Sequence, residues 1–345
     1  MNVMVKGWCP GALRPMESGD GLIVRVRPWC GTLTIEQTLG LADSAEQFGN
    51  GNIDLTRRAN LQLRGVGEDA LDRLQAVLAD LGLLDADAAA EGVRNIMVGP
   101  FASPEARALA DGLTQALLAE GSLHGLPAKF GWLVDGGEHL TILEQRSDIA
   151  LCLRDAGVAL RLRERWLGMV DKGNAIAAAL DLARGAIPAM TPLATTPADA
   201  ARPMGATAPF GRVRADQLRA LMALARSAGA TEVRLSPWRA LYFDRLIEGA
   251  ADLGFIVDAG DPLLRIEACP GRPECRSSSV DTRGDARRLA LRPFDGTIHV
   301  SGCAKGCARS APADLVLVGE GGRYGVVHRG TTRDPVEHIL APEEL

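Results

Sequence analysis

The sequence predicts an α+β fold with a duplicated architecture, in which two similar half-domains are each followed by a larger α+β domain under pseudo-twofold symmetry. Three observations lead to this prediction. The chain repeats itself at an offset of 180 residues, a proline-rich stretch separates the two copies, and four of the seven cysteines gather near the carboxyl end. The expected regions are a half-domain at 1–80, a larger domain at 81–186, a linker at 187–208, a second half-domain at 209–255 and a second larger domain at 256–345.

The internal repeat matches one helix and the strand that follows it. Each copy has an amphipathic helix that ends near a matched glycine, which is the residue preferred just after a helix. The alternating stretches 52–55 and 232–235 then predict two short strands. Thr34 and Gln37 have the spacing of a helix capping box. The alternative explanation is chance similarity between two helix–strand units. The matched pairs include Gly31 with Gly211, Gln37 with Gln217, Gly49 with Gly229, and Leu55 with Leu235.

Further elements are expected in the region after the first copy. Ser103 and Pro104 predict the start of a helix that reaches about Glu120, because serine caps helices and proline fits their first turn. Asn174 predicts the start of another helix, ending near Gly185. Two strands are expected at 129–134 and 149–153.

The linker is predicted from its prolines. Residues 187–209 contain five of them, and proline removes a backbone donor and clashes with the preceding helical turn. This stretch therefore cannot form a continuous helix, and we expect an extended connector.

Composition excludes some classes of protein. A formal net charge of -5 argues against a nucleic-acid binder, which needs a basic surface to meet phosphates. No apolar run approaches the roughly 18 residues that span a bilayer, so no membrane partner is expected. The first ten residues lack the apolar stretch of a signal peptide, and we expect a cytoplasmic protein. In a reducing compartment, clustered cysteines indicate metal ligands before disulfides.

The four clustered cysteines have C-x5-C and C-x3-C spacing. A cubane iron–sulfur cluster needs four converging thiolates, with small residues nearby that let backbone N–H groups reach the sulfurs. Gly302 and Gly306 meet this requirement. Zinc also takes four thiolates, although its knuckles favour shorter spacings than C-x5-C. Unligated thiols are the third alternative, and this ordinary state is expected for Cys9, Cys30 and Cys152. The candidate ligands are Cys269, Cys275, Cys303 and Cys307.

The two cysteine pairs resemble the cluster signature of the sulfite and nitrite reductases. Three further motifs carry the same resemblance. Residues 55–62 are similar to the strand of that family with the pattern T-x-R-x-x-x-Q, residues 94–96 are similar to its Arg-Asn motif, and residues 126–130 are similar to its L-P-x-K-F segment. The resemblance implies two ferredoxin-like half-domains, a 4Fe–4S cluster and a tetrapyrrole site that can hold sirohaem.

Two departures favour one branch of this family. Gly131 stands where a reductase has a second lysine, and Lys305 lies between the last two cysteines in an Ala-Lys-Gly setting. Clustered cations stabilise the small anion that a sulfite reductase reduces, so the loss of one disfavours that activity. Together with residues 9–10, 19–25 and 301–307, these departures resemble the precorrin-3B synthases of aerobic cobalamin biosynthesis.

The resemblance to this branch implies O2-dependent hydroxylation of precorrin-3A at C20, with lactone formation. Two alternatives stay open: a sirohaem-dependent sulfite or nitrite reductase, and a non-enzymatic tetrapyrrole-binding protein stabilised by zinc or a cluster. Arg58 and Lys129 are the implied catalytic residues. The implied tetrapyrrole contacts are Arg25, Arg58, Gln62, Arg94, Asn95 and Lys129, with Arg64 as a weaker addition.

The same resemblance implies partners and further cofactors. Electrons would come from a separate reductase or ferredoxin that uses NAD(P)H, because residues 49–51 and 319–322 suit turns better than dinucleotide loops. Besides the cluster, a mononuclear non-haem iron or sirohaem is implied. The five histidines (124, 139, 299, 328 and 338) show no facial-triad spacing. His299 is the nearest candidate ligand, and a structural role is the alternative.

Overall fold

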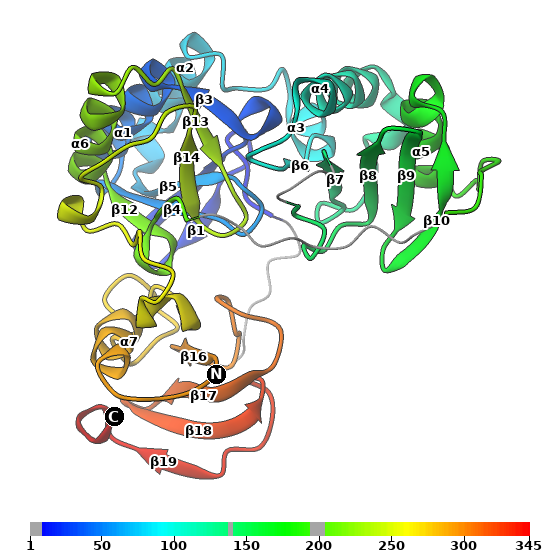
Figure 1. Cartoon of the computed structure of the whole chain (residues 1–345). Coiled ribbons are helices and arrows are strands. Elements are labelled where there is room, and N and C mark those ends of the chain that lie inside the picture. The colour runs from blue at the N-terminus through cyan, green and yellow to red at the C-terminus, as the bar shows by residue number, and fades with distance from the viewer. Residues whose placement is uncertain (1–8, 137–140, 194–203) are drawn as a thin grey trace.

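The computed structural model describes residues 9–136, 141–193 and 204–345, which form an α+β fold with four β-sheets (Figure 1). In Figure 1 the carboxyl-terminal sheet, in orange and red, lies below the other three. Some features of the sequence analysis lie outside the described residues. They are His139, the first eight residues of the chain and residues 194–203 of the predicted linker. In the part of the chain that is described, no helix is long and apolar enough to cross a membrane.

The two central sheets exchange one strand each. One sheet has the order β1 (Met16–Ser18), β2 (Gly21–Val26), β5 (Leu61–Val66), β4 (Asn52–Leu55) and β12 (Arg212–Arg214). The other has the order β11 (Ala206–Thr207), β14 (Ala240–Phe243), β13 (Glu232–Leu235) and β3 (Thr32–Thr34). Val213 of β12 pairs with Ile53, and Leu33 of β3 pairs with Val233. The exchange is reciprocal, because the four residues occupy equivalent places 180 positions apart.

Two helices join these sheets in one hydrophobic core. Helix α1 (Ile35–Phe48) packs against α6 (Ala215–Ser227), and α2 (Leu71–Asp80) packs beside α1. Leu41 and Leu221 are completely buried at this contact, and burying one such leucine contributes about 1.5–3 kcal/mol. The predicted capping box is confirmed: the Gln37 N–H donates to the Thr34 hydroxyl at 3.0 Å, and the Thr34 N–H donates to the Gln37 side-chain oxygen at 2.9 Å.

Both repeats also share two turns with left-handed backbone. Cys30 and Phe210 have φ values of 50° and 54°, and Ala59 and Arg239 have φ values of 51° and 61°. Residues with a Cβ rarely adopt this conformation, which costs about 1–2 kcal/mol relative to the right-handed region. The same unfavourable turns at the same places mean that the two copies follow the same backbone path.

The third sheet belongs to the region between the repeats. Its order is β10 (Arg165–Val170), β9 (Gly157–Leu162), β8 (Ile149–Arg154), β7 (Trp132–Asp135) and β6 (Ile96–Val98). Helices α4 (Pro104–Ala119) and α5 (Ala175–Ala183) pack on it and on each other, and α3 (Ala88–Val93) packs on α4. In Figure 1 this unit lies to the right of the central sheets.

The fourth sheet has the order β15 (Ile266–Ala268), β16 (Ile298–Ser301), β17 (Ala313–Glu320), β18 (Arg323–Gly330) and β19 (His338–Leu340). Strands β15 and β16 are neighbours and parallel, and α7 (Thr282–Ala290) packs on both. The carboxyl ends of adjacent parallel strands lie at the same edge of a sheet. The loops that follow β15 and β16 therefore begin side by side.

Three expectations about local elements need correction. The strand expected at 129–134 begins at Trp132, because residues before it form a turn in which the Phe130 N–H donates to the Pro127 carbonyl at 2.7 Å. Asn174 lies at the start of α5, but its side chain makes no capping hydrogen bond. The end of the predicted linker is not a connector: Ala206–Thr207 is strand β11, paired with β14.

We expect Thr34→Ala to lower the free energy of unfolding by about 1 kcal/mol, because it leaves the Gln37 N–H without its acceptor. Chemical denaturation measures this loss. Thr34→Ser is the matched control, since it keeps the hydroxyl, and it should stay close to wild type. A loss of the same size in both variants would mean that the cap is not responsible.

Candidate functional site

The fold brings the four candidate cluster ligands to one edge of the fourth sheet. Cys269 directly follows β15, and Cys303 comes two residues after β16. Cys275 and Cys307 lie in the same two loops. Cys269 is buried, Cys275 and Cys303 are partly buried, and Cys307 is exposed. Two parallel strand ends thus place all four thiols in neighbouring loops, and one side of the group reaches the surface.

Glycines let the backbone approach these sulfurs. The Gly302 N–H donates to the Cys269 sulfur at 3.1 Å. A Cβ at position 302 would lie 2.3 Å from the Ser278 hydroxyl and 3.5 Å from the Cys269 sulfur. Gly306 adopts a left-handed φ of 61° between the last two cysteines. An iron–sulfur site uses such N–H donors to its sulfurs, so this cradle suits one.

The thiols also act on one another electrostatically. The pKa of Cys307 is raised to about 11, first by desolvation of its thiol, although the residue as a whole is exposed, and then by the neighbouring sulfurs of Cys269, Cys303 and Cys275. Burial likewise raises the pKa of Cys303, with Cys275 and Cys269 adding to the effect. A cationic metal group would reverse this balance, since it stabilises thiolates. Four thiols in two loops that begin side by side are the donor set of a 4Fe–4S cluster, in which each cysteine binds a different iron. Across the described ranges, no group of three or more His, Cys, Asp and Glu is placed to hold one metal ion.

A second part of the site is built from cationic side chains of the first central sheet. Arg25 on β2 lies opposite Gln62 on β5. With its amide oxygen turned toward Arg25, Gln62 accepts hydrogen bonds from the guanidinium at 2.8 and 3.2 Å. Burial first, and then the charge of Arg27, lowers the pKa of Arg25 to about 10. The structure thus brings two of the predicted tetrapyrrole contacts together.

Arg58 connects this sheet to the predicted lysine segment. Its guanidinium donates to the Lys129 carbonyl at 3.4 Å and lies directly over Gly131. A Cβ at position 131 would lie 1.9 Å from Arg58 Nη1, so the absence of a side chain there makes room for the guanidinium. The same Nη1 is buried and has no hydrogen-bond partner among the described residues. A buried, unpaired cationic donor is suited to an anionic ligand.

Other predicted contacts lie in different surroundings. Arg94 is buried, donates to both carboxylate oxygens of Asp85 at 2.7 Å, and stacks on Trp29 at 3.9 Å. The Asn95 side chain donates to the Phe130 carbonyl at 2.9 Å and so anchors the segment that carries Lys129. The structure therefore engages Arg94 and Asn95 in protein contacts.

Lys129 and Arg64 have opposite surroundings. Lys129 is exposed at the surface of its turn. Arg64 is buried and donates to both carboxylate oxygens of Asp20, at 2.8 and 3.1 Å. Lys129 is accordingly open to a ligand, whereas the Arg64 guanidinium has protein partners.

The sequence did not indicate a cavity of about 300 Å³ that lies between the units. The Trp238 indole donates to Glu144 at 2.7 Å across it, and Arg239 Nε is buried there without a partner among the described residues. At the offset of 180 residues Trp238 and Arg239 correspond to Arg58 and Ala59, and this correspondence does not predict a cavity. Residues of the central sheets, of the unit between the repeats and of the carboxyl-terminal unit line it. Among them are Arg57, Glu144, Phe210, Trp238, Arg239 and Glu267.

Arg57 links this cavity to the cysteine loops. Its guanidinium pairs with Glu267, which lies on β15 two residues before Cys269. Glu267 also pairs with Arg309 at 2.8 Å. The adjacent residues Arg57 and Arg58 therefore reach in two directions, one toward the cysteine loops and one toward the Lys129 segment.

His299, the candidate ligand for a second iron, lies on β16 opposite Glu267. Its side chain is 1% exposed, and neither ring nitrogen has a hydrogen-bond partner among the described residues. Burial lowers its pKa to about 4, against the attraction of Glu267. The imidazole is therefore neutral near pH 7.

This pKa predicts a pH-dependent stability. The folded pKa of about 4 lies below the value of about 6.5 in an unfolded chain. The contribution of His299 is thus fully present above about pH 6.5 and is lost as the pH falls toward about 4. Between about pH 7.5 and pH 5, we expect wild type to lose about 2 kcal/mol more stability than His299→Gln. Urea unfolding at the two pH values measures this difference, and parallel losses would contradict it.

Comparisons with known proteins agree with this geometry. A family model described as the nitrite/sulfite reductase ferredoxin-like half domain matches residues 14–81. The chain is 30% identical to a ferredoxin–nitrite reductase of Synechococcus elongatus, over 49% of this chain and 35% of that protein. The fold is similar to that of the NirA protein of Mycobacterium tuberculosis, with a TM-score of 0.69 and 19% identity over 94% of this chain and 78% of that one.

A further relative covers nearly the whole chain. It is a precorrin-3B synthase of Sinorhizobium sp., which is 32% identical over 95% of this chain and 83% of that protein. Because the similarity extends from the half-domain through the cysteine loops, the chain belongs to the precorrin-3B synthase family, a cobalamin-biosynthesis branch of the sulfite reductase-like proteins.

Proposed function

We propose that this chain oxygenates precorrin-3A at C20 and closes a lactone. One atom of O2 enters the substrate as the C20 hydroxyl, and the other leaves as water after taking up two electrons and two protons. The electrons come from a separate reductase or ferredoxin that uses NAD(P)H. The lactone C–O bond forms when an acetate oxygen adds to the ring carbon next to C20. The bond between that carbon and the oxygen atom introduced from O2 breaks, and the carboxyl proton passes to this oxygen, which stays on C20 as the hydroxyl, so the substrate gains one oxygen atom in total.

The position of the adjacent residues Arg57 and Arg58 carries this proposal. Arg57 reaches the strand that leads to Cys269, and Arg58 reaches the Lys129 segment. Cations between these two places suit a macrocycle with carboxylate arms, because guanidinium groups bind carboxylates bidentately. Arg58 and Arg25 bind the carboxylates in this proposal, Gln62 orients Arg25, and Lys129 is a cation at the open side of the site.

The proposal assigns a 4Fe–4S cluster to Cys269, Cys275, Cys303 and Cys307. The N–H donor of Gly302 and the placement of the cysteines in two loops after neighbouring parallel strands support this assignment. Such a cluster, when bound, supplies electrons one at a time. The chain's own contribution is to orient the substrate and to keep its carboxylates paired.

We further infer that the fold arose by duplication of a ferredoxin-like half-domain. The reciprocal pairing of β3 with β13 and of β12 with β4 supports a pseudo-twofold relation between residues 1–80 and 209–255. In this division, 81–186 provides the Lys129 side of the tetrapyrrole site and 256–345 holds the cluster. The residues between them connect the two halves as far as the start of β11 at Ala206.

Two measurements test the proposed function. Anaerobically purified protein should contain iron and acid-labile sulfide and should absorb broadly as a cluster does, whereas a sirohaem Soret band would favour a sulfite or nitrite reductase. A colourless protein loaded with zinc would favour a non-enzymatic binding protein. Incubation with precorrin-3A, O2 and a reductant should add one oxygen atom to the mass of the tetrapyrrole. No gain in mass would reject the proposed reaction.

Cysteine substitutions test the cluster assignment. Cys307→Ser should lose the cluster, because it removes one of four thiolates, and iron and sulfide per chain should fall steeply. Cys152→Ser is the control, since Cys152 is buried in β8, in a different sheet from the four cysteines. Its iron and sulfide content should remain that of wild type. Equal contents in the two variants would contradict the assignment.

Gly131→Ala tests the placement of Arg58. The new methyl group would overlap Arg58 Nη1, so the guanidinium must shift and its contact with the Lys129 carbonyl is disturbed. We expect kcat/KM for precorrin-3A to fall by about 10- to 100-fold, as for other small displacements of a binding group. Gly125→Ala is the matched control in the same segment, because a Cβ there meets nothing within 4 Å. Equal activity of Gly131→Ala and wild type would show that Arg58 does not act from this position.

A further inference from the structure

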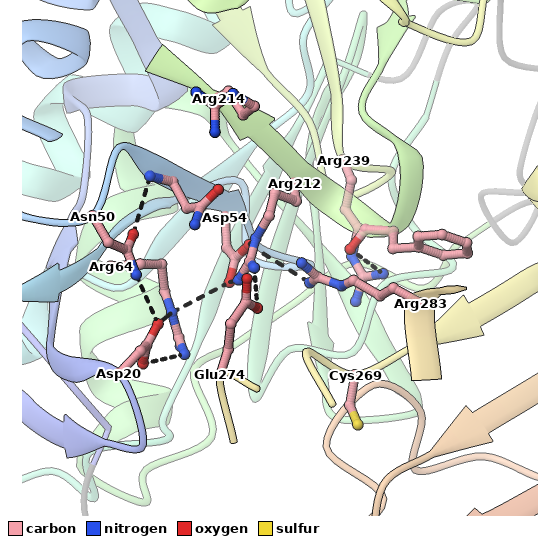
Figure 2. Close-up of polar contacts among 12 residues, drawn as sticks. Asp20, Asn50, Asp54, Arg64, Arg212, Arg214, Arg239, Cys269, Glu274 and Arg283 are labelled. Atoms are coloured by element: carbon pink, nitrogen blue, oxygen red, sulfur yellow. Dashed lines mark hydrogen bonds and ion pairs between the residues drawn. The ribbon is translucent and has the colours of Figure 1, made fainter. Parts of the chain in front are cut away.

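A buried group of charges lies where the central sheets meet the cluster-bearing unit (Figure 2). At its centre is Asp54 on β4, which is 9% exposed. The Arg212 guanidinium on β12 donates to both Asp54 oxygens, at 2.7 and 3.0 Å. Arg64 on β5 and Arg283 on α7 lie at ion-pair distances of 3.7 and 3.6 Å from the same carboxylate. One carboxylate thus meets guanidinium groups from both halves of the repeat and from the cluster-bearing unit.

The group continues into the loop that carries Cys275. Besides Asp54, the Arg212 guanidinium pairs with Glu274, the residue immediately before this cysteine. Figure 2 shows Arg212 between the two carboxylates. The other charged side chains of this loop, Arg272 and Arg276, are exposed. Glu274 is therefore the charged residue by which the loop is tied to the central sheets.

A second contact fixes the same loop from the same direction. The turn between β1 and β2 packs closely on this loop. A Cβ at Gly19 would lie 2.6 Å from the backbone nitrogen of Arg276 and 3.1 Å from the Cys275 Cα. Asp20, the next residue of this turn, pairs with Arg64. The turn thus contacts the loop directly and is itself connected to the Asp54 group.

The charges of the group balance, with three carboxylates (Asp20, Asp54 and Glu274) facing three guanidinium groups (Arg64, Arg212 and Arg283). Burial opposes the ionisation of Asp54, but Arg283 and Arg212 outweigh it and hold the pKa of this carboxyl well below its usual range. Removing one partner would leave a buried charge without compensation, which is far more costly than losing an exposed pair. The most accessible relief is release of the loop.

We propose that Arg212, held by Asp54, is a positioning residue for Cys275: it fixes one cluster ligand from the first central sheet. The effect on the geometry of the cluster rests on the proposed function. The placement of the Cys275 thiol does not, because it can be measured in protein without iron. A ligand that is held before the cluster binds needs no ordering when it binds, so Arg212 sets how readily the cluster is taken up and kept.

The experiment uses the full chain with Arg212→Gln, Arg212→Lys and Asp54→Asn. In iron-free protein, alkylation of each cysteine by iodoacetamide is followed by mass spectrometry. Arg219→Gln is the matched control, because Arg219 also forms a bidentate pair between the two repeats, with Asp43 and Glu46, but on the exposed α1–α6 face. Cys152, which is 0% exposed, reports global unfolding within the same sample.

We expect Cys275 to be alkylated about tenfold faster in Arg212→Gln and Asp54→Asn, while Cys152 stays unreactive. Arg212→Lys keeps the positive charge but cannot form the two parallel hydrogen bonds of a guanidinium, and it should give an intermediate rate of Cys275 alkylation. Arg219→Gln should match wild type. If Cys152 also reacts in a variant, that variant has unfolded, and Arg212→Lys then decides the question. Unchanged alkylation of Cys275 in a folded Arg212 variant would overturn the proposal.

Iron-loaded protein separates this inference from the proposed function. Wild type without iron and sulfide would refute the cluster, and the alkylation rates would still decide whether Arg212 positions Cys275. Where wild type does hold a cluster, the Arg212→Gln protein should lose it several-fold faster in air and show an altered midpoint potential. A variant that only lowers the stability of the fold should leave the midpoint potential of the cluster unchanged. If both this potential and the rate of cluster loss match wild type, Arg212 has only a structural role.

Discussion

The reciprocal strand exchange between the two central sheets is the contact on which the rest of the structure depends. Each half-domain alone would leave a sheet edge with unpaired N–H and C=O groups, which invites pairing with another chain. Here β12 covers the edge at β4, and β3 covers the edge at β13. The exchange also sets α1 against α6, so the apolar cores of the two halves become one. The register of a few backbone hydrogen bonds thereby fixes the two halves of the repeat against each other.

This exchange explains why the candidate site is composite. Asp54 and Arg212 face each other because their strands are paired across the repeats. The segment 56–60 leaves the same sheet, with Arg57 directed to the cluster-bearing unit and Arg58 to the unit that contains Lys129. The cysteines depend on a different contact, the parallel pairing of β15 with β16. The chemistry therefore lies between units, where no unit alone provides a complete set of side chains.

Local signals made part of this structure predictable. The capping box at Thr34, the strands at 52–55 and 232–235 and the helix that begins at Pro104 are all specified by neighbouring residues, and the structure contains them. Contacts between distant residues were harder to predict. The ion pair of Arg94 with Asp85 and the cavity beside Trp238 depend on tertiary packing, for which a single sequence provides no periodicity or spacing. Strand β7 begins later than predicted for a local reason: the residues before it belong to the turn at Pro127, although their strand propensity favoured an earlier start.

The contact between Arg58 and Gly131 has an evolutionary consequence. Because the guanidinium occupies the volume that any Cβ at position 131 requires, the two positions are epistatic. A lysine introduced at 131 would push the arginine side chain into another rotamer and so change the placement of its guanidinium as well. The effect of a second lysine at this place therefore depends on the residue at position 58. Libraries that aim to convert one activity into the other would need to vary both codons together.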